Sequence, residues 1–275
     1  MINETFVLSA RSLKKWIRNP AAVVPGLVTS IFYIALFGSS FNPTNLIPSG
    51  SGASGVLTSA FGGAPTYITY LTAGVICLIL VFNMAFGGID LVLDRQLGFL
   101  NTLLTAPISR ASIFLSGVFQ NFVKAIFLGV LTFLIALVIP NGLELPSGFT
   151  VVDFLGIFLA FSLLGLGLSS VFTAIALSVK SIDSLVAIVN FLTLPLIFMS
   201  NALFPSSSFP QWLMDIAGVN PISKANEAAR LLIINGNLSG SQLSTFTGDM
   251  LYLVGFVVVF GLIGYFAAIK ALAPK

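Results

Sequence analysis

The sequence predicts an all-α polytopic membrane protein with six transmembrane helices, organised as a single domain over residues 1–275. Composition is the first reason: 57% of the residues are hydrophobic, 8% are charged, and mean hydropathy is +1.05, whereas about a quarter of a soluble domain is charged. Six apolar segments, each near the roughly 20 residues that cross a bilayer, are the second. The third is the position of the basic residues, which gather between alternate apolar segments.

Residues 4–18 are predicted to form an amphipathic helix in the membrane interface. On a helix, Arg11, Lys15 and Arg18 lie opposite an apolar face, and Trp16 suits the headgroup level. A basic start before an apolar run also fits a secretory signal peptide. The run at 21–41 is long enough to span the membrane, however, which favours a retained helix.

The spans are expected at 21–41, 66–89, 111–139, 151–178, 184–204 and 250–269. Residues 42–65 carry no charge and are rich in Gly and Ser, which is typical of an external loop. In the third span Lys124 lies on a polar stripe with Ser112, Ser116 and Gln120. Its ammonium either snorkels to the surface, the simpler prediction, or faces a wet cavity between helices.

The stretch 94–110 is a polar interruption about three times longer than an ordinary connection. Helical spacing would place Leu97, Leu100, Leu103 and Leu104 on one apolar stripe. Pro107 is expected to stop this helix and Ser109 to cap the next one. An alternative is an interfacial helix that only rests on lipid headgroups.

The distribution of basic residues predicts the orientation. Nine of the 12 fall on one side of the six-span layout: Arg11, Lys14, Lys15, Arg18, Arg95, Arg110, Lys180, Lys270 and Lys275. The other side has only Lys224 and Arg230. By the positive-inside rule, both termini are expected in the cytoplasm of a prokaryotic cell with the chain in its plasma membrane.

The segment 205–249 is predicted to form two short helices that dip into the outer membrane face. Pro210 and Trp212 suit the start of the first, and Asn220 and Pro221 suit the cap and first position of the second. An apolar stripe then follows at Ile222, Ala225, Ala229 and Leu232. Glu227 is placed to pair with Lys224 or Arg230.

Several functional classes are disfavoured by what the sequence lacks. With no histidine and one cysteine, Cys77, no catalytic or metal-binding constellation is predicted. A secondary transporter normally needs acidic residues near the bilayer midplane, whereas Asp90, Asp153 and Asp183 lie near the ends of spans. The chain also has no G-x-x-x-x-G-K-[ST] phosphate-binding loop, so a transport role would need energy from another subunit.

Two motifs resemble one known family. The stretch Asp94-Arg95-Gln96-Leu97-Gly98-Phe99-Leu100, continuing through Leu103 to Arg110, is similar to the cytoplasmic signature of type-2 ABC transporter permeases. That group includes daunorubicin-resistance-like drug exporters and polysaccharide exporters. A second match covers Pro195-Leu196, Phe198-Met199-Ser200-Asn201, Phe204-Pro205, Pro210-Gln211-Trp212-Leu213 and Asn220-Pro221-Ile222-Ser223, with Glu227 and Arg230.

The resemblance implies a homodimer of permeases paired with two copies of a separate ATPase, which would bind ATP and Mg. The coupling residues it implies are Asp94, Arg95, Gly98, Leu100, Leu103, Leu104, Pro107, Ser109 and Arg110. It places the first and fifth spans at the dimer contact, with Asn190, Thr193 and Ser200 as dimer or pathway residues, and it places Pro210, Trp212, Asn220, Pro221, Glu227 and Arg230 in outer helices.

The expected cargo is a hydrophobic or amphiphilic small molecule, because the spans carry Phe, Leu and Ile with scattered Ser, Thr and Asn. Export of a polysaccharide or glycolipid is the alternative within the same family. Membrane lipid is an expected partner, and nucleic acid is not.

Overall fold

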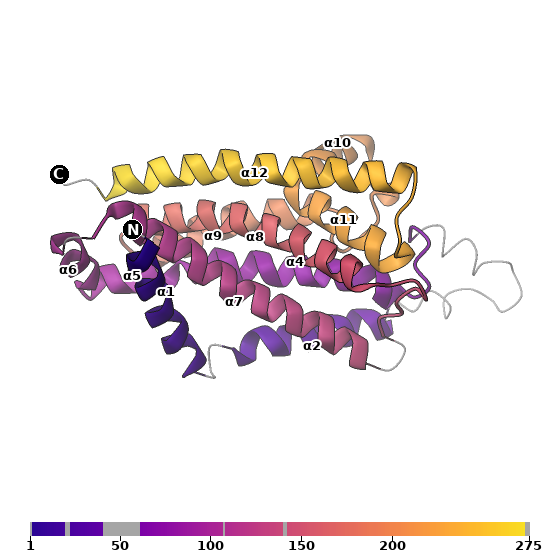
Figure 1. The fold of residues 1–275 in the computed structure, drawn as a ribbon, viewed down its shortest axis with the longest axis horizontal. Helices are drawn as coiled ribbons and strands as arrows, with labels where there is room; N and C mark the ends of the chain where they lie inside the picture. Colours follow the sequence, from indigo (N-terminus) through magenta and orange to yellow (C-terminus); the bar gives the residue numbers. More distant parts are fainter. Residues whose placement is uncertain (1, 20–22, 41–60, 107, 140–141, 273–275) are drawn as a thin grey trace, which may run out of the picture.

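A computed structural model describes residues 2–19, 23–40, 61–106, 108–139 and 142–272. The expected external loop at 42–65 therefore lies largely outside the described residues. The regular elements in these ranges are helical, as the sequence predicts, and they run mostly along one long axis (Figure 1). The helices are α1 (Ile2–Ile17), α2 (Val24–Ser40), α4 (Tyr67–Gly87), α5 (Ile89–Gln96), α6 (Phe99–Thr105), α7 (Arg110–Val138), α8 (Val151–Ser178), α9 (Ile182–Phe198), the 3-10 turn Ser206–Ser208, α10 (Gln211–Val219), α11 (Pro221–Asn235) and α12 (Ser241–Ala271).

Four stretches among the described residues are long and apolar enough to cross a membrane: Tyr67–Gln96, Arg110–Val138, Val151–Ser178 and Ser241–Ala271. The helices on the first and fifth expected spans, α2 and α9, have 17 residues each. Such helices rise about 25 Å, somewhat less than the roughly 30 Å hydrocarbon core. The chain is therefore a multi-pass membrane protein, while the full six-span layout stays a prediction.

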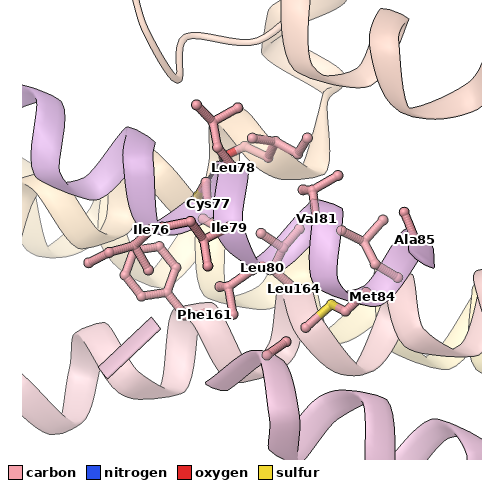
Figure 2. Packing of buried hydrophobic residues seen from close by; sticks show 14 of the residues in the cluster. Ile76, Cys77, Leu78, Ile79, Leu80, Val81, Met84, Ala85, Phe161 and Leu164 are labelled. Carbon is pink, nitrogen blue, oxygen red and sulfur yellow. Dashed lines mark hydrogen bonds between the residues drawn. The ribbon is translucent and has the colours of Figure 1, made fainter. Parts of the chain in front are cut away.

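The core of the bundle is built around α4. Every residue from Thr69 to Val81 is buried, because α2, α7, α8 and α11 pack around this helix. Figure 2 shows Ile76, Leu80 and Met84 of α4 beside Phe161 and Leu164 of α8. A helix that is apolar on all sides, as α4 is, is suited to this central position. The peripheral α12 instead exposes an apolar face with Leu251, Val258, Leu262 and Phe266, as expected for contact with lipid acyl chains.

Two boundaries differ from the sequence prediction. The last helix begins at Ser241 rather than near 250, because its polar first turns pack beside α11 instead of forming a loop. The expected fifth span, 184–204, ends early, since α9 stops at Phe198 and Met199–Phe204 continue without helical structure.

Gly74 allows α4 to approach the segment that follows α9. A Cβ at this position would lie 1.7 Å from the carbonyl oxygen of Ala202, and both sides of that contact are backbone. Gly74→Ala is therefore expected to destabilise the protein by at least about 1–3 kcal/mol, the usual cost of overpacking a core. Thermal unfolding in detergent measures this. Gly255→Ala is the matched control, because its Cβ would meet nothing within 4 Å; equal stability of the two variants would contradict the close approach.

Candidate ATPase-coupling site

The polar stretch 94–110 forms a corner at the end of the bundle, next to α1 (Figure 1). The helix α5 follows α4 directly after Gly88, so Asp94 and Arg95 lie at the end of the long stretch Tyr67–Gln96, before the separate helix α6. Gly98 then adopts φ 79°, a left-handed conformation that reverses the chain into the seven-residue helix α6. Leu97 lies before this reversal, so the predicted single stripe of four leucines is wrong for Leu97.

Arg95 anchors the corner to the rest of the chain. Its two terminal nitrogens donate to the carbonyls of Val179 and Leu177 at the end of α8, and Gln96 donates to the carbonyl of Lys180 at 3.3 Å. These bonds satisfy carbonyls that a helix C-terminus leaves without partners. The guanidinium is therefore bound to carbonyls within the chain, whereas the resemblance implies that it contacts an ATPase.

The apolar side of α6 faces the chain itself. Leu100 is buried and Leu103 is half-buried, in a hollow between α1, α5 and α7. Arg11 of α1 lies over the ring of Phe99, 3.7 Å from its centroid, which is a cation–π contact. Leu100 and Leu103 thus hold α6 against the bundle, whereas the sequence suggested that they meet another subunit.

The outward side of the corner carries a different leucine. Leu97 is 80% exposed. Thr102 and Thr105, which follow it on α6, are also exposed. Arg110 at the start of α7 is half-buried. Pro107 and the side chain of Leu104 lie outside the described part of the chain. Among the described residues, Leu97 is therefore the large apolar side chain that this corner presents outward.

The start of α7 is tied to α1. As predicted, Ser109 caps α7, its hydroxyl accepting a hydrogen bond from the Ser112 amide at 3.1 Å. The Glu4 carboxylate accepts from the Ser112 hydroxyl at 2.8 Å and from the Ser109 amide at 3.3 Å. The hydrogen bond from Ser112 is the largest cause that lowers the pKa of Glu4 below its usual value, and the Ser109 amide also contributes. The first helix is thus held against the corner by polar contacts.

Gly98 gives a test of the corner that needs no partner. A Cβ here would meet nothing within 4 Å, so a substitution acts only through the left-handed backbone. Gly98→Ala is expected to cost about 1–2 kcal/mol and Gly98→Asn less, because asparagine tolerates this conformation better. Trypsin cleavage after Arg110 should accelerate about fivefold or more in the alanine variant. Equal cleavage rates for the two variants would show that the reversal at Gly98 is not required.

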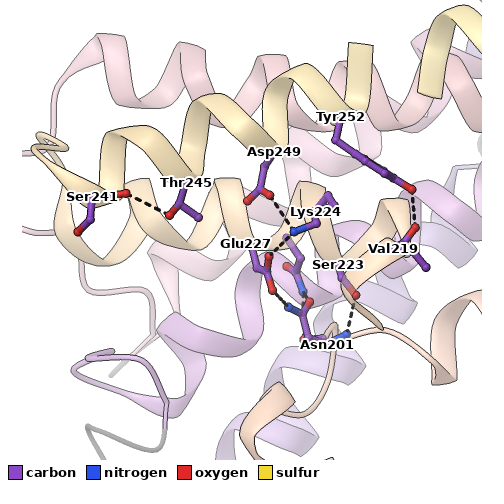
Figure 3. Close-up of polar contacts among 10 residues, drawn as sticks. Asn201, Val219, Ser223, Lys224, Glu227, Ser241, Thr245, Asp249 and Tyr252 are labelled. Atoms are coloured by element: carbon purple, nitrogen blue, oxygen red, sulfur yellow. Dashed lines mark hydrogen bonds and ion pairs between the residues drawn. The ribbon is translucent and has the colours of Figure 1, made fainter. Parts of the chain in front are cut away.

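At the opposite end, α10, α11 and the start of α12 form a polar network (Figure 3). Asn220 caps α11 as predicted, accepting from the Ile222 amide at 2.9 Å, and Pro221 takes the first position. Pro210 immediately precedes α10, and Trp212 is exposed on it. Glu227 pairs with Lys224 at 3.4 Å and accepts from Asn201 at 2.9 Å.

Lys224 joins this network to α12 through Asp249, at 3.0 Å. Burial alone would lower the pKa of the Lys224 ammonium, but the hydrogen bond to Asp249 and the charge of Glu227 raise it above its usual value. Arg230, the other expected partner of Glu227, instead donates to the carbonyls of Tyr70, Asn201 and Ala202 at 2.8–3.1 Å. Its guanidinium also lies 3.6 Å from the centroid of the Tyr70 ring.

The three expected dimer or pathway residues occupy different environments. Asn190 is half-buried, Thr193 is 1% exposed, and the Ser200 hydroxyl donates to the Ile197 carbonyl within the chain. Only Asn190 therefore retains surface on α9. The same helix exposes Ile188, Phe191, Leu194 and Phe198 along one apolar stripe.

The sequence reading missed four contributors to these sites: Glu4, Arg11, Asn201 and Asp249. In the sequence, Arg11 and Asp249 are distinguished only by their charge. Glu4 and Arg11 contact Ser112 and Phe99, which lie about 90 or more residues away in the chain. Asn201 stood inside the recognised motif, but its contacts with Glu227 and Asn226 depend on how α11 packs. The spacing of residues along one helix does not indicate which residues of another helix they contact.

A family model described as ABC-2 type transporter matches residues 3–234, which includes the corner and most of the outer network. The chain belongs to the ABC-2 type transporter family. This ABC-2 permease is a membrane transport subunit, and permeases of the family generally pair with a nucleotide-binding ATPase subunit.

The ABC-2 permease is also similar to individual curated proteins. A protein from Pyropia yezoensis whose name describes it as a transport permease, ycf38, is 30% identical over 256 residues, covering 91% of this chain and 81% of that protein. A relative with the same name from Cyanophora paradoxa is 27% identical and covers 96% of this chain and 87% of its own length. A protein named as a doxorubicin resistance ABC transporter permease, DrrC, from Mycobacterium tuberculosis is 23% identical, with 94% and 85% covered.

Proposed function

We propose that this ABC-2 permease exports hydrophobic or amphiphilic small molecules, driven by an ATPase that docks on the corner formed by α5 and α6. The observation that carries the docking surface is Leu97, a leucine 80% exposed on an otherwise polar turn. Burial of an exposed leucine side chain on contact stabilises a complex by about 1.5–3 kcal/mol through the hydrophobic effect. The corner is fixed to α8 by Arg95 and to α1 by the Arg11–Phe99 contact, so a push on it acts on several helices together.

The proposed orientation places the corner in the cytoplasm. Arg11, Lys14 and Lys15 of α1, Arg110 at the start of α7 and Lys270 near the end of α12 all belong to this end of the bundle (Figure 1). This distribution supports a cytoplasmic location for both termini. The outer network of α10–α12 would then face the opposite side, in or near the outer leaflet.

We further propose a homodimer in which α9 and α2 meet the second copy. The exposed stripe of α9, with Phe191 at 78% and Phe198 at 67%, and the half-buried Asn190 support this contact. Thr193 is buried inside the monomer and is not part of it. On a Cys77→Ala background, cysteines at 191 or 198 should crosslink between copies, whereas crosslinks formed only from exposed positions of α8, such as Leu155, would contradict the arrangement.

The experiment that tests the function is purification of the tagged full chain from its native membranes. A P-loop ATPase should co-purify, and ATP hydrolysis by the reconstituted complex should rise with amphiphilic drugs or lipids. Stimulation by glycans alone would replace the proposed cargo with the polysaccharide alternative. Recovery of the chain without any ATPase would overturn the proposal.

A further inference from the structure

Lys124 is a buried cation that the coupling proposal does not use. It lies in α7 about 20 Å from the start of that helix, is 7% exposed, and its ammonium contacts Asp90 at 2.9 Å. The other oxygen of Asp90 lies 3.8 Å from the ammonium of Lys15, on α1. Of the two sequence predictions for Lys124, the structure favours a cavity between helices, because the ammonium pairs with a residue of another helix and lines an open cavity there.

Lys124 and Asp90 line an open cavity of about 440 Å³ between α1, α2, α4, α5 and α7. This volume lies in the usual range of about 300–1,000 Å³ for ligand sites. Most of the lining is apolar or aromatic, with Trp16 from α1, Tyr33 from α2, and Phe82 and Phe86 from α4. The cavity thus combines a long apolar wall with a charged group.

The charges around Asp90 favour an anion. A neighbouring hollow, which shares Asp90, is lined by Arg11, Lys15 and Asp94. The two hollows together contain three cations, Arg11, Lys15 and Lys124, and two carboxylates, Asp90 and Asp94. The cations therefore outnumber the carboxylates by one. A cationic ligand would have to displace Lys124 from Asp90, whereas an anionic headgroup could bind Lys15 and Lys124 without leaving either uncompensated. Basic pockets between membrane helices bind acidic lipid headgroups in this way.

We propose that this cavity binds an anionic membrane lipid, with its headgroup at Lys124 and Lys15 and one acyl chain along Trp16, Tyr33 and Phe82. The site lies within one copy of the chain and is separate from the outward face of the α5–α6 corner. It does not depend on the ATPase. The lipid would come from the leaflet that meets α1.

Trp16 provides a direct reporter. The chain has two tryptophans, so Trp212→Phe leaves Trp16 as the only fluorophore of its kind. The full-length variant is reconstituted into vesicles that contain either brominated phosphatidylglycerol or brominated phosphatidylcholine. Quenching of Trp16 should reach half its maximum at a mole fraction of the anionic lipid about fivefold lower than that of the zwitterionic lipid, since one basic residue near anionic lipid is worth about fivefold in binding.

Substitutions then locate the preference. Lys124→Gln and Lys15→Gln should each reduce the preference for the anionic lipid severalfold, and Asp90→Asn should increase it, because it removes a competing carboxylate. Lys14→Gln is the matched control: it removes the same charge from an exposed position of the same helix, but Lys15 lies 3.8 Å from Asp90 and lines the neighbouring hollow, whereas Lys14 does not line it. Equal quenching by the two lipids, or Lys15→Gln and Lys14→Gln variants that behave alike, would overturn the proposal even if Lys124→Gln does not insert.

Discussion

Leu97→Asp is expected to release the partner ATPase while the ABC-2 permease stays folded and inserted. Leu97 is 80% exposed within the chain, so the substitution leaves intramolecular packing unchanged. In a docked complex the same position would be dry, and an unpaired carboxylate there costs several kcal/mol. Loss of the hydrophobic contact alone, about 2 kcal/mol for a buried leucine side chain, corresponds to a roughly 30-fold weaker affinity. The measurement is ATPase co-purification, with cargo-stimulated ATP hydrolysis in the same membranes.

Two variants control for trivial effects of this change. Leu97→Met keeps an apolar side chain and should retain the ATPase. Leu243→Asp introduces the same charge at another exposed leucine, 49% exposed near the start of α12 at the opposite end of the bundle, and should also retain it. Normal ATPase recovery with Leu97→Asp would remove Leu97 from the docking surface.

Arg230→Met is expected to produce the largest loss of stability. Arg230 is 7% exposed, and it donates to three backbone carbonyls, two of which follow α9 and one of which lies in α4. Methionine fills a similar volume but leaves these groups without the donor, at about 1–3 kcal/mol for each unsatisfied group. The free energy of unfolding should fall by at least about 3 kcal/mol. Thermal unfolding in detergent is the measurement.

Arg230→Lys should fall between the wild type and Arg230→Met, because one ammonium cannot reproduce a planar fork of five donors. Arg18→Met is the matched control, since Arg18 is exposed after α1. If Arg230→Met were as stable as Arg18→Met, the three hydrogen bonds would not stabilise the outer end of the bundle.

Local signals in the sequence predicted the local structure well. The caps at Ser109 and Asn220 are where residue chemistry places them, because a cap needs only a side-chain oxygen two or three residues from a free amide. The stripe Ile222, Ala225, Ala229 and Leu232 is buried, because helical spacing alone decides which residues share a face.

Features that depend on packing between helices did not follow from the sequence. The polar start of α12 has the composition of a loop, and it lies beside α11, where the Lys224–Asp249 pair joins the two helices. Arg95 binds carbonyls 82 and 84 residues away, so periodicity gave no indication that it is an anchor. Helical spacing places Leu97 on one stripe with Leu100, Leu103 and Leu104, because spacing alone does not reveal the reversal at Gly98, although glycine is the residue that permits it.

The central claim is that the corner of α5 and α6 seats an ATPase, and site-specific photocrosslinking tests it most directly. A photoreactive amino acid at position 97 of the full chain, irradiated in native membranes, should yield an adduct whose second component is a P-loop ATPase. The same probe at position 243 should yield none. If position 97 forms adducts only with lipid, the corner is an interfacial helix resting on headgroups, and the coupling role assigned to it is contradicted.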